Sequence, residues 1–516
     1  MNGAESLVRT AVATGVDVCF ANPGTTEMPL VAALDSVPGM RGILGLFEGV
    51  CTGAADGYGR MTGKPALTLL HLGPGFANGI ANLHNARRAP SPVVNVIGDH
   101  ASWHLAADAP LTSDIESLAK PVSCWLRSSG EAARVGQDTA EAIAAAQSTP
   151  GGVATLIVPA DAQWSDGGQV GRVMPGDASQ AAPLPSGDTV DAVAGALRGA
   201  QQPAILLRGS GLLEPGLGFA ARIAAACGAR LLCDTFPARA ERGAGRAAVE
   251  RVGYFPEQGA ETLKGLDLLV LAGSRDPVTF FGYPDIPSRL APKDCRSLTL
   301  AEPTEDVAGA LEALADALGA PAIGTVAAKS DLARPTGALD PGSMGAAIAA
   351  LQPENAIIMD EGATSGLPHY VMSTGAPPHT YLALTGGAIG QGFPCATGAA
   401  VACPDRKVIA LQADGSGMYT LQALWTQARE GLDVTTVVCS NRSYRILQIE
   451  LARAGVAEPG RNARGMTDLS TPPLDWVSLS KGLGVPAVRA EDADTLVREL
   501  ERALAEPGPS LIEAVL

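Results

Sequence analysis

The stretch that decides the fold is KVIALQADGSGMYTLQALWTQAREGLDVTTVVCSNRSYR, which covers Lys407–Arg445. Two apolar runs, Val408–Gln412 and Thr435–Cys439, have the length and composition of buried strands, and the residues between them predict a helix. A strand–helix–strand unit makes the two strands parallel, so their carboxyl ends meet at the sheet edge where such folds bind ligands. We therefore expect Asp414 and Asn441, which follow the two strands, to be neighbours in space.

These strand ends offer oxygen atoms and free backbone amides. The carboxylate of Asp414 and the amide carbonyl of Asn441 are hard ligands that suit Mg²⁺. Gly415 and Ser416 open the helix expected at Met418–Glu430, where unpaired N–H groups and the helix dipole favour an anion. A simpler alternative is that Asp414 only caps this helix. Asn441 at the end of the next strand favours a site for a metal ion and a diphosphate.

Length, composition and charge exclude several classes of protein. The chain has 516 residues, 46% hydrophobic and 17% charged, so it can bury several cores and is not disordered. Its 53 acidic and 37 basic residues give a net charge of −16, which disfavours binding to nucleic acid or an anionic membrane. No apolar run approaches the ~20 residues of a membrane span, the start does not read as a signal peptide, and the nine cysteines form no C-x-x-C pair. We expect a cytoplasmic protein.

Strands and helices alternate along most of the chain, which predicts an α/β fold with mostly parallel sheets and helices on both faces. Three doubly wound α/β domains are expected, at 1–164, 188–324 and 343–516. Ser165–Gly187 has the composition of a linker, and Gly324–Gly342 marks the second boundary. Strands are expected at Asp17–Ala21, Ala66–His71, Val93–Ile97, Ala204–Leu207, Arg230–Cys233, Leu268–Ala272 and Ala356–Met359.

At its metal and anion motif the chain resembles the thiamine-diphosphate (ThDP) enzymes of the acetolactate synthase, benzoylformate decarboxylase and pyruvate decarboxylase group. Their fingerprint is G-D-G followed at a set distance by N-N. Here Ala413-Asp414-Gly415 is followed, after the 25 residues 416–440, by Asn441, so Ala413 and Ser440 depart from the fingerprint. Further blocks resemble the group in the same order along the chain, namely Asn22–Glu27, Phe47–Pro65, Gly73–Gly79 and Gly386–Ala396.

The resemblance implies the ThDP-binding fold, with pyrimidine, central and pyrophosphate domains, and the cofactors ThDP and Mg²⁺. Asp414 and Asn441 match the metal-binding side chains of the group, and the third ligand, a backbone carbonyl, maps to Ser443. The methyl group of Ala413, where the group has glycine, is expected to alter cofactor affinity. The positions that match diphosphate contacts are Thr364, Gly415 and Ser416.

The chemistry of this group needs a carbanion at C2 of the thiazolium ring, for which the cofactor itself is the electron sink. Glu48 resembles the family carboxylate that bonds N1′ of the aminopyrimidine and favours the tautomer that removes the C2 proton. Its flanking residues are apolar and are expected to shield it from water. Ile389 matches the bulky aliphatic residue beneath the bent cofactor, and the backbone carbonyl of Gly387 matches the acceptor of the 4′-amino group. The plainer alternatives are an exposed glutamate at a helix start and a core isoleucine.

Two further residues match the substrate end of the site. His71 ends a predicted strand and aligns with an active-site histidine of benzoylformate decarboxylase, where acetolactate synthases usually have another residue. An imidazole there can move protons at neutral pH. Thr25 matches a serine that contacts the substrate carboxylate in the same family. Weaker candidates for the substrate pocket are His104, His369, Tyr444 and Leu447.

Together these residues indicate a ThDP- and Mg²⁺-dependent 2-oxo acid decarboxylase or carboligase that resembles benzoylformate decarboxylase and forms a C2 carbanion and enamine. In relatives the active site lies between the first domain of one subunit and the third of another, so a homodimer or homotetramer is expected. One alternative is a protein like the acetolactate synthase large subunit, against which Pro110 and Leu111 replace a Phe-Gln pair. FAD is possible, but no clear FAD motif in the middle domain supports it. Another alternative, suggested by Ala413 and Ser440, is a non-catalytic ThDP-binding paralogue.

Overall fold

The structure, a computed structural model, describes residues 1–172 and 182–516. It divides into two compact units. The larger unit comprises Met1–Ser179, Leu332–Met372 and Leu384–Leu516, and the smaller one comprises Gln180–Asp331 and Ser373–Ala383. The middle of the predicted linker, 173–181, lies outside the described residues.

The larger unit begins with a six-stranded parallel sheet. Its strands, in spatial order, are β2 (Arg41–Leu44), β1 (Val18–Asn22), β3 (Ala66–His71), β4 (Val93–Asp99), β6 (Val153–Pro159) and β5 (Trp125–Ser128). Alternate residues of the buried strands face opposite sides, as the pleat requires. One set packs under helices α1 (Gly3–Ala13), α2 (Met28–Ser36), α6 (Ala132–Gln147) and α7 (Ala160–Trp164) in a single apolar cluster.

Five parallel strands of the larger unit belong to the second sheet. Their spatial order is β17 (Ala487–Ala490), β18 (Ser510–Val515), β16 (Val434–Ser440), β15 (Val408–Ala413) and β13 (Ile357–Glu361). Helices along this part of the chain are α12 (Pro341–Leu351), α13 (Leu367–Met372), α14 (Gly392–Ala402), α15 (Asp414–Gly417), α16 (Ala423–Glu430), α17 (Arg445–Arg453), α18 (Arg461–Gly465), α19 (Trp476–Gly482) and α20 (Ala493–Ala505).

The smaller unit holds the third sheet. Its parallel strands are β10 (Glu250–Arg251), β8 (Arg230–Cys233), β7 (Pro203–Leu207), β11 (Leu268–Ala272) and β12 (Arg296–Ala301). Helices α8 (Gly187–Gly199), α9 (Gly216–Cys227), α10 (Pro256–Leu263) and α11 (Val307–Ala317) accompany it, and β9 (Ala240–Arg242) pairs antiparallel with β14 (His379–Ala383). The predicted fold class, three mostly parallel α/β sheets, is therefore confirmed.

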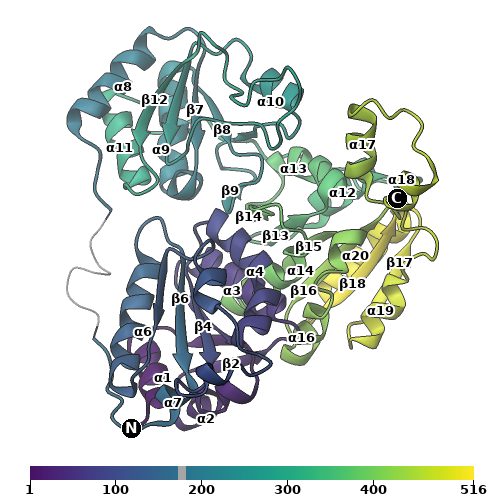
Figure 1. Cartoon of the computed structure of the whole chain (residues 1–516). Coiled ribbons are helices and arrows are strands. Elements are labelled where there is room, and N and C mark those ends of the chain that lie inside the picture. Colours follow the sequence, from purple (N-terminus) through teal and green to yellow (C-terminus); the bar gives the residue numbers. More distant parts are fainter. Residues whose placement is uncertain (173–181) are drawn as a thin grey trace. The chain divides into compact units, whose positions relative to one another are not determined.

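Helices α3 (Glu48–Thr62), α4 (Leu72–Arg88) and α14 lie between the two sheets of the larger unit (Figure 1). Helices α3 and α14 approach each other closely at their crossing, and only glycine leaves room for this. A Cβ on Gly57 would lie 2.1 Å from the carbonyl oxygen of Cys395, and one on Gly398 would lie 1.8 Å from that of Ala54. The small residues of the Phe47–Pro65 block thus have a packing role, which the sequence motif alone did not indicate.

A buried ion pair fixes the same crossing. The guanidinium of Arg60 on α3 donates to both carboxylate oxygens of Asp56 at 2.8 Å, and the two side chains are 1% and 0% exposed. Arg60 also donates to Thr385 at 2.9 Å, and the amide of Gln391 donates to Asp56. This network therefore ties α3 to the chain segment that leads into α14.

The helix predicted at Met418–Glu430 is wrong at its beginning. A short turn of helix, α15, covers Asp414–Gly417, and the next helix, α16, starts only at Ala423. Between them the amides of Tyr419 and Thr420 bond to carbonyls three residues back. Two glycines in four residues weaken the first turn, which favours these tighter bonds over a continuous α-helix.

No helix in the described parts of the chain is long and apolar enough to cross a membrane.

Candidate active site

The carboxylate of Asp414 joins the ends of two neighbouring strands. Its Oδ1 accepts the N–H of Gly415 at 2.8 Å, and its Oδ2 accepts the N–H of Arg442 at 2.6 Å. Strands β15 and β16 pair in parallel, with Ala413 opposite Cys439, so the expected proximity of Asp414 and the 441 region is confirmed. Burial raises the pKa of Asp414, while the two backbone amides act in the opposite direction.

The other two predicted metal ligands lie in the turn that Asp414 holds. Arg442 has a φ of +55°, which folds the chain so that Oδ1 of Asn441 accepts the N–H of Ser443 at 3.0 Å. A Cβ on Gly415 would lie 2.4 Å from the ring of Tyr444, so this close approach requires glycine. The turn gathers one carboxylate, one amide oxygen and one backbone carbonyl, a donor set that fits Mg²⁺.

This donor set contains a single carboxylate. No cluster of three or more His, Cys, Asp or Glu side chains suited to a metal occurs among residues 1–172 and 182–516.

Glu361 holds the glycine-rich loop 386–392 against the same sheet edge. It is the last residue of β13, pairs with Gln412 across the strands, and is 3% exposed. Its Oε1 accepts the N–H of Gly390 at 2.6 Å, and its Oε2 accepts the N–H of Gly392 and, at 3.1 Å, the amide of Gln412. Burial raises the pKa of Glu361 to about 7 against the effect of these donors. The sequence motifs gave no signal for this residue.

Helix α4 holds the same loop from the other side. Asn85 donates to the carbonyl of Ala388 at 2.7 Å and accepts its N–H at 3.2 Å, and Nε2 of His84 lies 3.1 Å from the carbonyl oxygen of Gly386. Gly387, between these contacts, is exposed and has a φ of +75°, and Ile389 is half-buried. The two predicted cofactor-supporting residues therefore project from a loop that is bonded on both sides.

The two predicted hydroxyl contacts to a diphosphate differ in exposure. Ser416 is 6% exposed, and its Oγ bonds to the amide of Gln412 at 2.7 Å and to the carbonyl of Ala413 at 3.2 Å. Thr364 lies in a short 3₁₀ turn, η4 (Ala363–Ser365), and is half-buried. Gly415 and Ser416 lie in α15, which has only one turn, and not at the start of the longer helix expected there.

Glu48 is the first residue of α3 and lies beside α4. Its Oε2 accepts the side-chain amide of Asn78 at 3.0 Å, and a Cβ on Gly75 would lie 3.0 Å from its Oε1. The side chain is half-buried, and its neighbour Leu46 is 45% exposed. The apolar shielding expected for Glu48 is thus incomplete within a single chain.

His71 is held by a buried carboxylate that the sequence analysis missed. Nδ1 of His71, at the end of β3, lies 2.7 Å from Oε2 of Glu27 and 3.1 Å from Oγ1 of Thr26. Glu27 is 0% exposed and also accepts the N–H of Gly24 at 2.7 Å. Thr25 begins the same turn, η1 (Thr25–Glu27), so the two predicted substrate-contacting residues come from adjacent strand ends of the first sheet. The signal in the sequence was the acidic residue two positions after Thr25.

The predicted residues therefore form two groups, one at the carboxyl edge of each sheet in the larger unit. The N-terminal group is Thr25, Glu48 and His71, and the C-terminal group is Thr364, Gly387, Ile389, Asp414, Gly415, Ser416, Asn441 and Ser443. Within the described ranges, no hydrogen bond or ion pair joins Glu48, Thr25 or His71 to Asp414 or Asn441. Of the weaker histidine candidates, His104 follows the carboxyl end of β4, the strand that pairs with β3, and His369 lies on α13. His369 is fully buried, with Nε2 2.8 Å from Oε1 of Gln352, and the ring of His104 stacks edge-on against another histidine, His100, at 5.3 Å.

Two regions of the chain match domain models of a known family. Residues 1–118 match the thiamine pyrophosphate enzyme, N-terminal TPP binding domain, and residues 360–514 match the C-terminal TPP binding domain. A Mycobacterium tuberculosis protein, IlvX, named provisionally as an acetolactate synthase large subunit, is 53% identical over 100% of this chain and 99% of its own length. The chain belongs to the thiamine-diphosphate-dependent enzyme family. It is thus a ThDP-dependent enzyme of the decarboxylase and carboligase group.

More distant members of the ThDP-dependent family cover the whole chain as well. A benzoylformate decarboxylase from Pseudomonas aeruginosa is 28% identical over 97% of this chain and 96% of its own. The solved structure of a ThDP-dependent 4-hydroxybenzoylformate decarboxylase from Rhodococcus jostii RHA1 has a TM-score of 0.84, covering 100% of this chain and 99% of that one at 24% identity. This structural likeness supports the fold.

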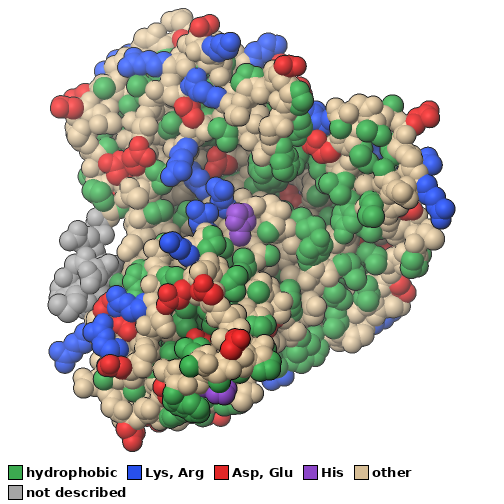
Figure 2. Space-filling view, viewed as in Figure 1, with side chains coloured by type: hydrophobic (Ala, Val, Ile, Leu, Met, Phe, Trp, Pro, Cys, Tyr) green, Lys and Arg blue, Asp and Glu red, His purple; other side chains and the backbone are tan. Residues whose placement is uncertain are grey.

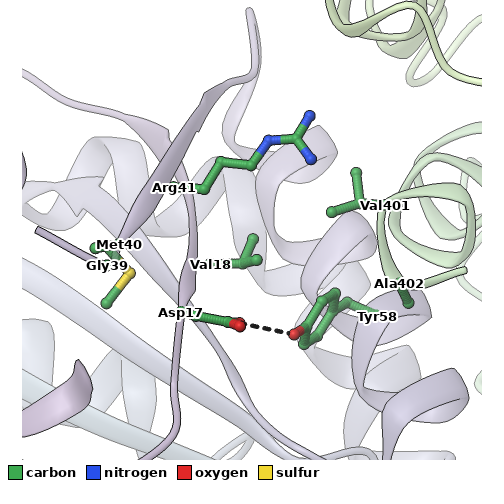
Figure 3. Close-up of a pocket in the computed structure, with 8 residues that line it drawn as sticks. All are labelled: Asp17, Val18, Gly39, Met40, Arg41, Tyr58, Val401 and Ala402. Carbon is green, nitrogen blue, oxygen red and sulfur yellow. Dashed lines mark hydrogen bonds between the residues drawn. The ribbon is translucent and has the colours of Figure 1, made fainter. Parts of the chain in front are cut away.

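A cavity of about 550 Å³ opens at the opposite, amino edge of the first sheet of this ThDP-dependent enzyme (Figure 3). Its charged groups already have partners, because Tyr58 donates to Asp17 at 3.0 Å and Arg41 pairs with Glu430 at 2.6 Å. Burial and the neighbouring carboxylate raise the pKa of Tyr58 to about 12. The cavity is separate from both groups of candidate residues. It is lined by Asp17, Val18, Gly39, Met40, Arg41, Tyr58, Val401 and Ala402.

Proposed function

We propose that this enzyme is a Mg²⁺- and ThDP-dependent decarboxylase or carboligase of 2-oxo acids, similar to benzoylformate decarboxylase. The observation that carries the proposal is the His71–Glu27 pair at the strand edge beside Thr25. According to the family resemblance, benzoylformate decarboxylase has a histidine at this position, whereas acetolactate synthases usually have another residue. When bound, ThDP supplies the electron sink that would accept the electron pair of the bond to the leaving carboxylate.

The strand-end turn after β16 is the proposed anchor of the metal and the diphosphate. Asp414 and Asn441 would bind Mg²⁺ through side-chain oxygens, and Ser443 through its backbone carbonyl. Two of these oxygens are already oriented by backbone amides, which lowers the cost of ordering them on binding. Thr364, Gly415 and Ser416 are the proposed diphosphate contacts.

The proton transfers to and from the cofactor and the substrate are proposed to involve the N-terminal group. Glu48, oriented by Asn78, is proposed to bond the aminopyrimidine of the cofactor, while Gly387 and Ile389 support it from the C-terminal loop. Because Glu27 occupies Nδ1 of His71, Nε2 is the nitrogen left to exchange a proton with the substrate. Thr25, in the turn next to His71, is proposed to donate to the substrate carboxylate.

We propose that the working site lies between two copies of the chain, as a homodimer or homotetramer. The side chain of Glu48 is half-buried, and large apolar side chains remain exposed around the C-terminal group, namely Leu367, Val371, Tyr419, Leu447 and Met466. Figure 2 shows hydrophobic side chains gathered over the C-terminal elements of the larger unit. A second copy that covers this surface would remove it from water.

Mixing two inactive variants tests the shared site. Glu48→Gln disables the N-terminal group and Asp414→Asn the C-terminal group, so a mixed dimer retains one intact site. Activity that reappears after the two variants are unfolded and refolded together supports the proposal. Mixtures that stay as inactive as each variant alone, while light scattering shows that they form dimers, contradict it.

Acetolactate synthesis is the second candidate, since the 53% identical relative bears that name. One assay separates the two functions. The purified enzyme, loaded with Mg²⁺ and ThDP, is offered pyruvate, aliphatic 2-oxo acids and benzoylformate, and both CO₂ and the organic products are measured. An aldehyde from a bulky 2-oxo acid supports the decarboxylase, whereas acetolactate from pyruvate supports the alternative.

A further inference from the structure

The buried carboxylate of Glu361 has no role in the function proposed above. It is 3% exposed, and no Lys, Arg or His among the described residues forms an ion pair with it. Burying a carboxyl group is costly unless hydrogen bonds replace its hydration. Here the replacements are the N–H groups of Gly390 and Gly392 and the amide of Gln412. Two of the three donors therefore belong to the glycine-rich loop.

Both donors follow closely after Gly387–Ile389, the part of the loop proposed to support the cofactor. Gly390 directly follows Ile389 and has a φ of +94°, a conformation that side chains rarely adopt. A Cβ on Gly392 would lie 2.2 Å from Oε1 of Gln412, so the loop approaches the strand edge as closely as glycine allows. On the far side, Asn85 holds Ala388 through both its N–H and its carbonyl. Both neighbours of Ile389 in the chain, Ala388 and Gly390, are therefore held by hydrogen bonds from opposite sides of the loop.

Glu361 also reaches the anion end of the site. The amide of Gln412 that donates to Glu361 at 3.1 Å donates as well to Oγ of Ser416 at 2.7 Å. Gln412 lies on β15 only two residues before Asp414. One carboxylate therefore connects the loop to the strand end that carries the proposed metal ligand.

We propose that Glu361 is a positioning residue whose two carboxyl oxygens hold the amides of Gly390 and Gly392 and so fix the Gly387–Ile389 support relative to Asp414 and Ser416. This inference rests on the proposed function, because it takes the loop to be the support of the cofactor. Glu361 acts through the loop and through Gln412, and it does not itself contact the reacting atoms.

The variant Glu361→Gln tests the clamp with little change in shape. Both oxygens of the Glu361 carboxyl group accept a loop N–H, whereas a carboxamide has one acceptor oxygen and an NH₂ group that only donates. Whichever way it is turned, one loop N–H loses its acceptor and faces another donor. Glu361→Asp is the conservative variant, since it keeps both acceptors on a shorter side chain and should recover part of the wild-type behaviour.

The first measurement needs no cofactor. Hydrogen–deuterium exchange of the peptide covering residues 386–392 is followed in the free protein. The expected result is exchange about tenfold faster in Glu361→Gln than in the wild type, because one amide of the clamp is released. The matched control is Gln427→Met, which removes a buried amide bonded to Thr397 and Phe393 on α14 without touching the loop. Its 386–392 exchange should equal that of the wild type.

The second measurement uses the loaded enzyme. Calorimetry gives the affinity for ThDP with Mg²⁺ present, and quenched-flow NMR gives the rate at which the C2 proton of bound ThDP exchanges. The expected results for Glu361→Gln are an affinity about tenfold weaker and a C2 exchange at least about tenfold slower, with Gln427→Met near the wild type. Glu361→Asp should lie between the two.

The outcomes separate the failure of this inference from the failure of the proposed function. Unchanged loop exchange in Glu361→Gln overturns the clamp. Faster loop exchange with unchanged ThDP affinity and C2 exchange overturns the positioning role. A Gln427→Met variant as impaired as Glu361→Gln in all three readouts also overturns it, since any buried amide would then serve. If the wild type takes up no ThDP, the proposed function fails, and the loop exchange alone decides the clamp.

Discussion

Nδ1 of His71 lies 2.7 Å from Oε2 of Glu27, a carboxylate that is 0% exposed. Glu27 is itself fixed by the N–H of Gly24 at 2.7 Å, and a Cβ on Gly98 would lie 1.9 Å from its other oxygen. A carboxylate confined in this way sets both the plane of the imidazole and the tautomer of its neutral form. The geometry makes Nε2 of His71 the exposed nitrogen at the strand edge.

Replacing Glu27 by Gln should impair the proton transfer assigned to His71. The amide no longer favours a proton on Nδ1, so the ring samples the wrong tautomer and orientation. We expect kcat to fall about tenfold or more, equivalent to at least about 1.4 kcal/mol, with a smaller change in the KM for the 2-oxo acid. Steady-state kinetics and the pH profile of kcat provide the check.

Thr26→Val is the comparison for that variant, because the uncharged Thr26 hydroxyl belongs to the same network: it donates to Oε1 of Glu27 at 2.5 Å and lies 3.1 Å from Nδ1 of His71. Its kcat should stay within about threefold of the wild type. Equal losses in Thr26→Val and Glu27→Gln would indicate that the turn, and not the carboxylate, is what matters.

Asp414→Asn should remove the dependence of cofactor binding on magnesium. The amide keeps the size of the side chain but loses the only negative charge among the three proposed ligands. We expect the affinity for ThDP in the presence of Mg²⁺ to fall about a hundredfold, roughly 2.7 kcal/mol, towards the value measured with a chelator. Asp475→Asn is the matched control, since Asp475 is exposed and accepts the N–H of Ser478 at the start of α19. A variant at position 414 that binds ThDP with unchanged magnesium dependence would contradict the metal assignment.

The strands of the core were predictable because they are short, apolar and bounded by turn residues. Ala66–His71, Arg230–Cys233 and Leu268–Ala272 were predicted with their observed bounds. The helix at Met418–Glu430 was not, because an amphipathic pattern does not reveal how two glycines at its start divide it. The parallel pairing expected for the two strands was then enough to predict that Asp414 lies next to the turn at Asn441.

The residues that the sequence missed are those whose role depends on distant contacts. Glu361 belongs to no block that resembles the family, and Glu27 ends the Asn22–Glu27 block without an assigned role. Only the fold reveals that Glu361 faces loop 386–392 and that Glu27 faces His71. Asn85 is likewise 303 residues away from its partner Ala388. The family resemblance indicated the residues that touch the cofactor in relatives but not the side chains that hold them.

Ala413→Gly should strengthen the binding of ThDP. Ala413 has a φ of −71° and a ψ of 144°, a conformation that any residue adopts, so the glycine is not needed for the backbone. Removing the methyl group frees space beside the proposed diphosphate site. We expect an affinity about fivefold higher, near 1 kcal/mol, at a cost of ~0.5–1 kcal/mol in stability. Calorimetry checks the first effect and thermal melting the second, and weaker binding would place the methyl group away from the diphosphate.

Arg60→Met should destabilise the protein strongly, because it leaves Asp56 charged and buried. Breaking a buried pair by removing one partner costs ~3–5 kcal/mol in the free energy of unfolding. The exposed pair Arg334–Glu501, with side chains 61% and 41% exposed, is the comparison, and Arg334→Met should cost less than about 1 kcal/mol. Denaturant unfolding measures both. Similar losses in the two variants would mean that the Asp56–Arg60 pair is not what secures α3 against α14.

The pKa of Glu361 gives the stability a dependence on pH that Glu361→Gln should abolish. The folded carboxyl keeps its proton up to about pH 7, whereas its ordinary pKa is 4.5. Burial is the main cause, and the neighbouring Asp360 acts in the same direction against the donors Gly390, Gly392 and Gln412. Between these two values the folded state binds more protons than the unfolded state. The contribution of Glu361 to stability is therefore complete below pH 4.5 and is lost as the pH rises through 7.

The difference in unfolding free energy between the wild type and Glu361→Gln isolates this effect, because the other titrating groups are common to both proteins. From pH 5 to pH 8 the wild type should lose up to roughly 3 kcal/mol relative to the variant. Cys395, whose pKa burial raises to about 12, is also close to Glu361 but stays protonated throughout this range. Urea unfolding at several pH values supplies the measurement. Parallel stability curves would mean that Glu361 is ionised across the whole interval, with its hydrogen bonds offsetting the burial.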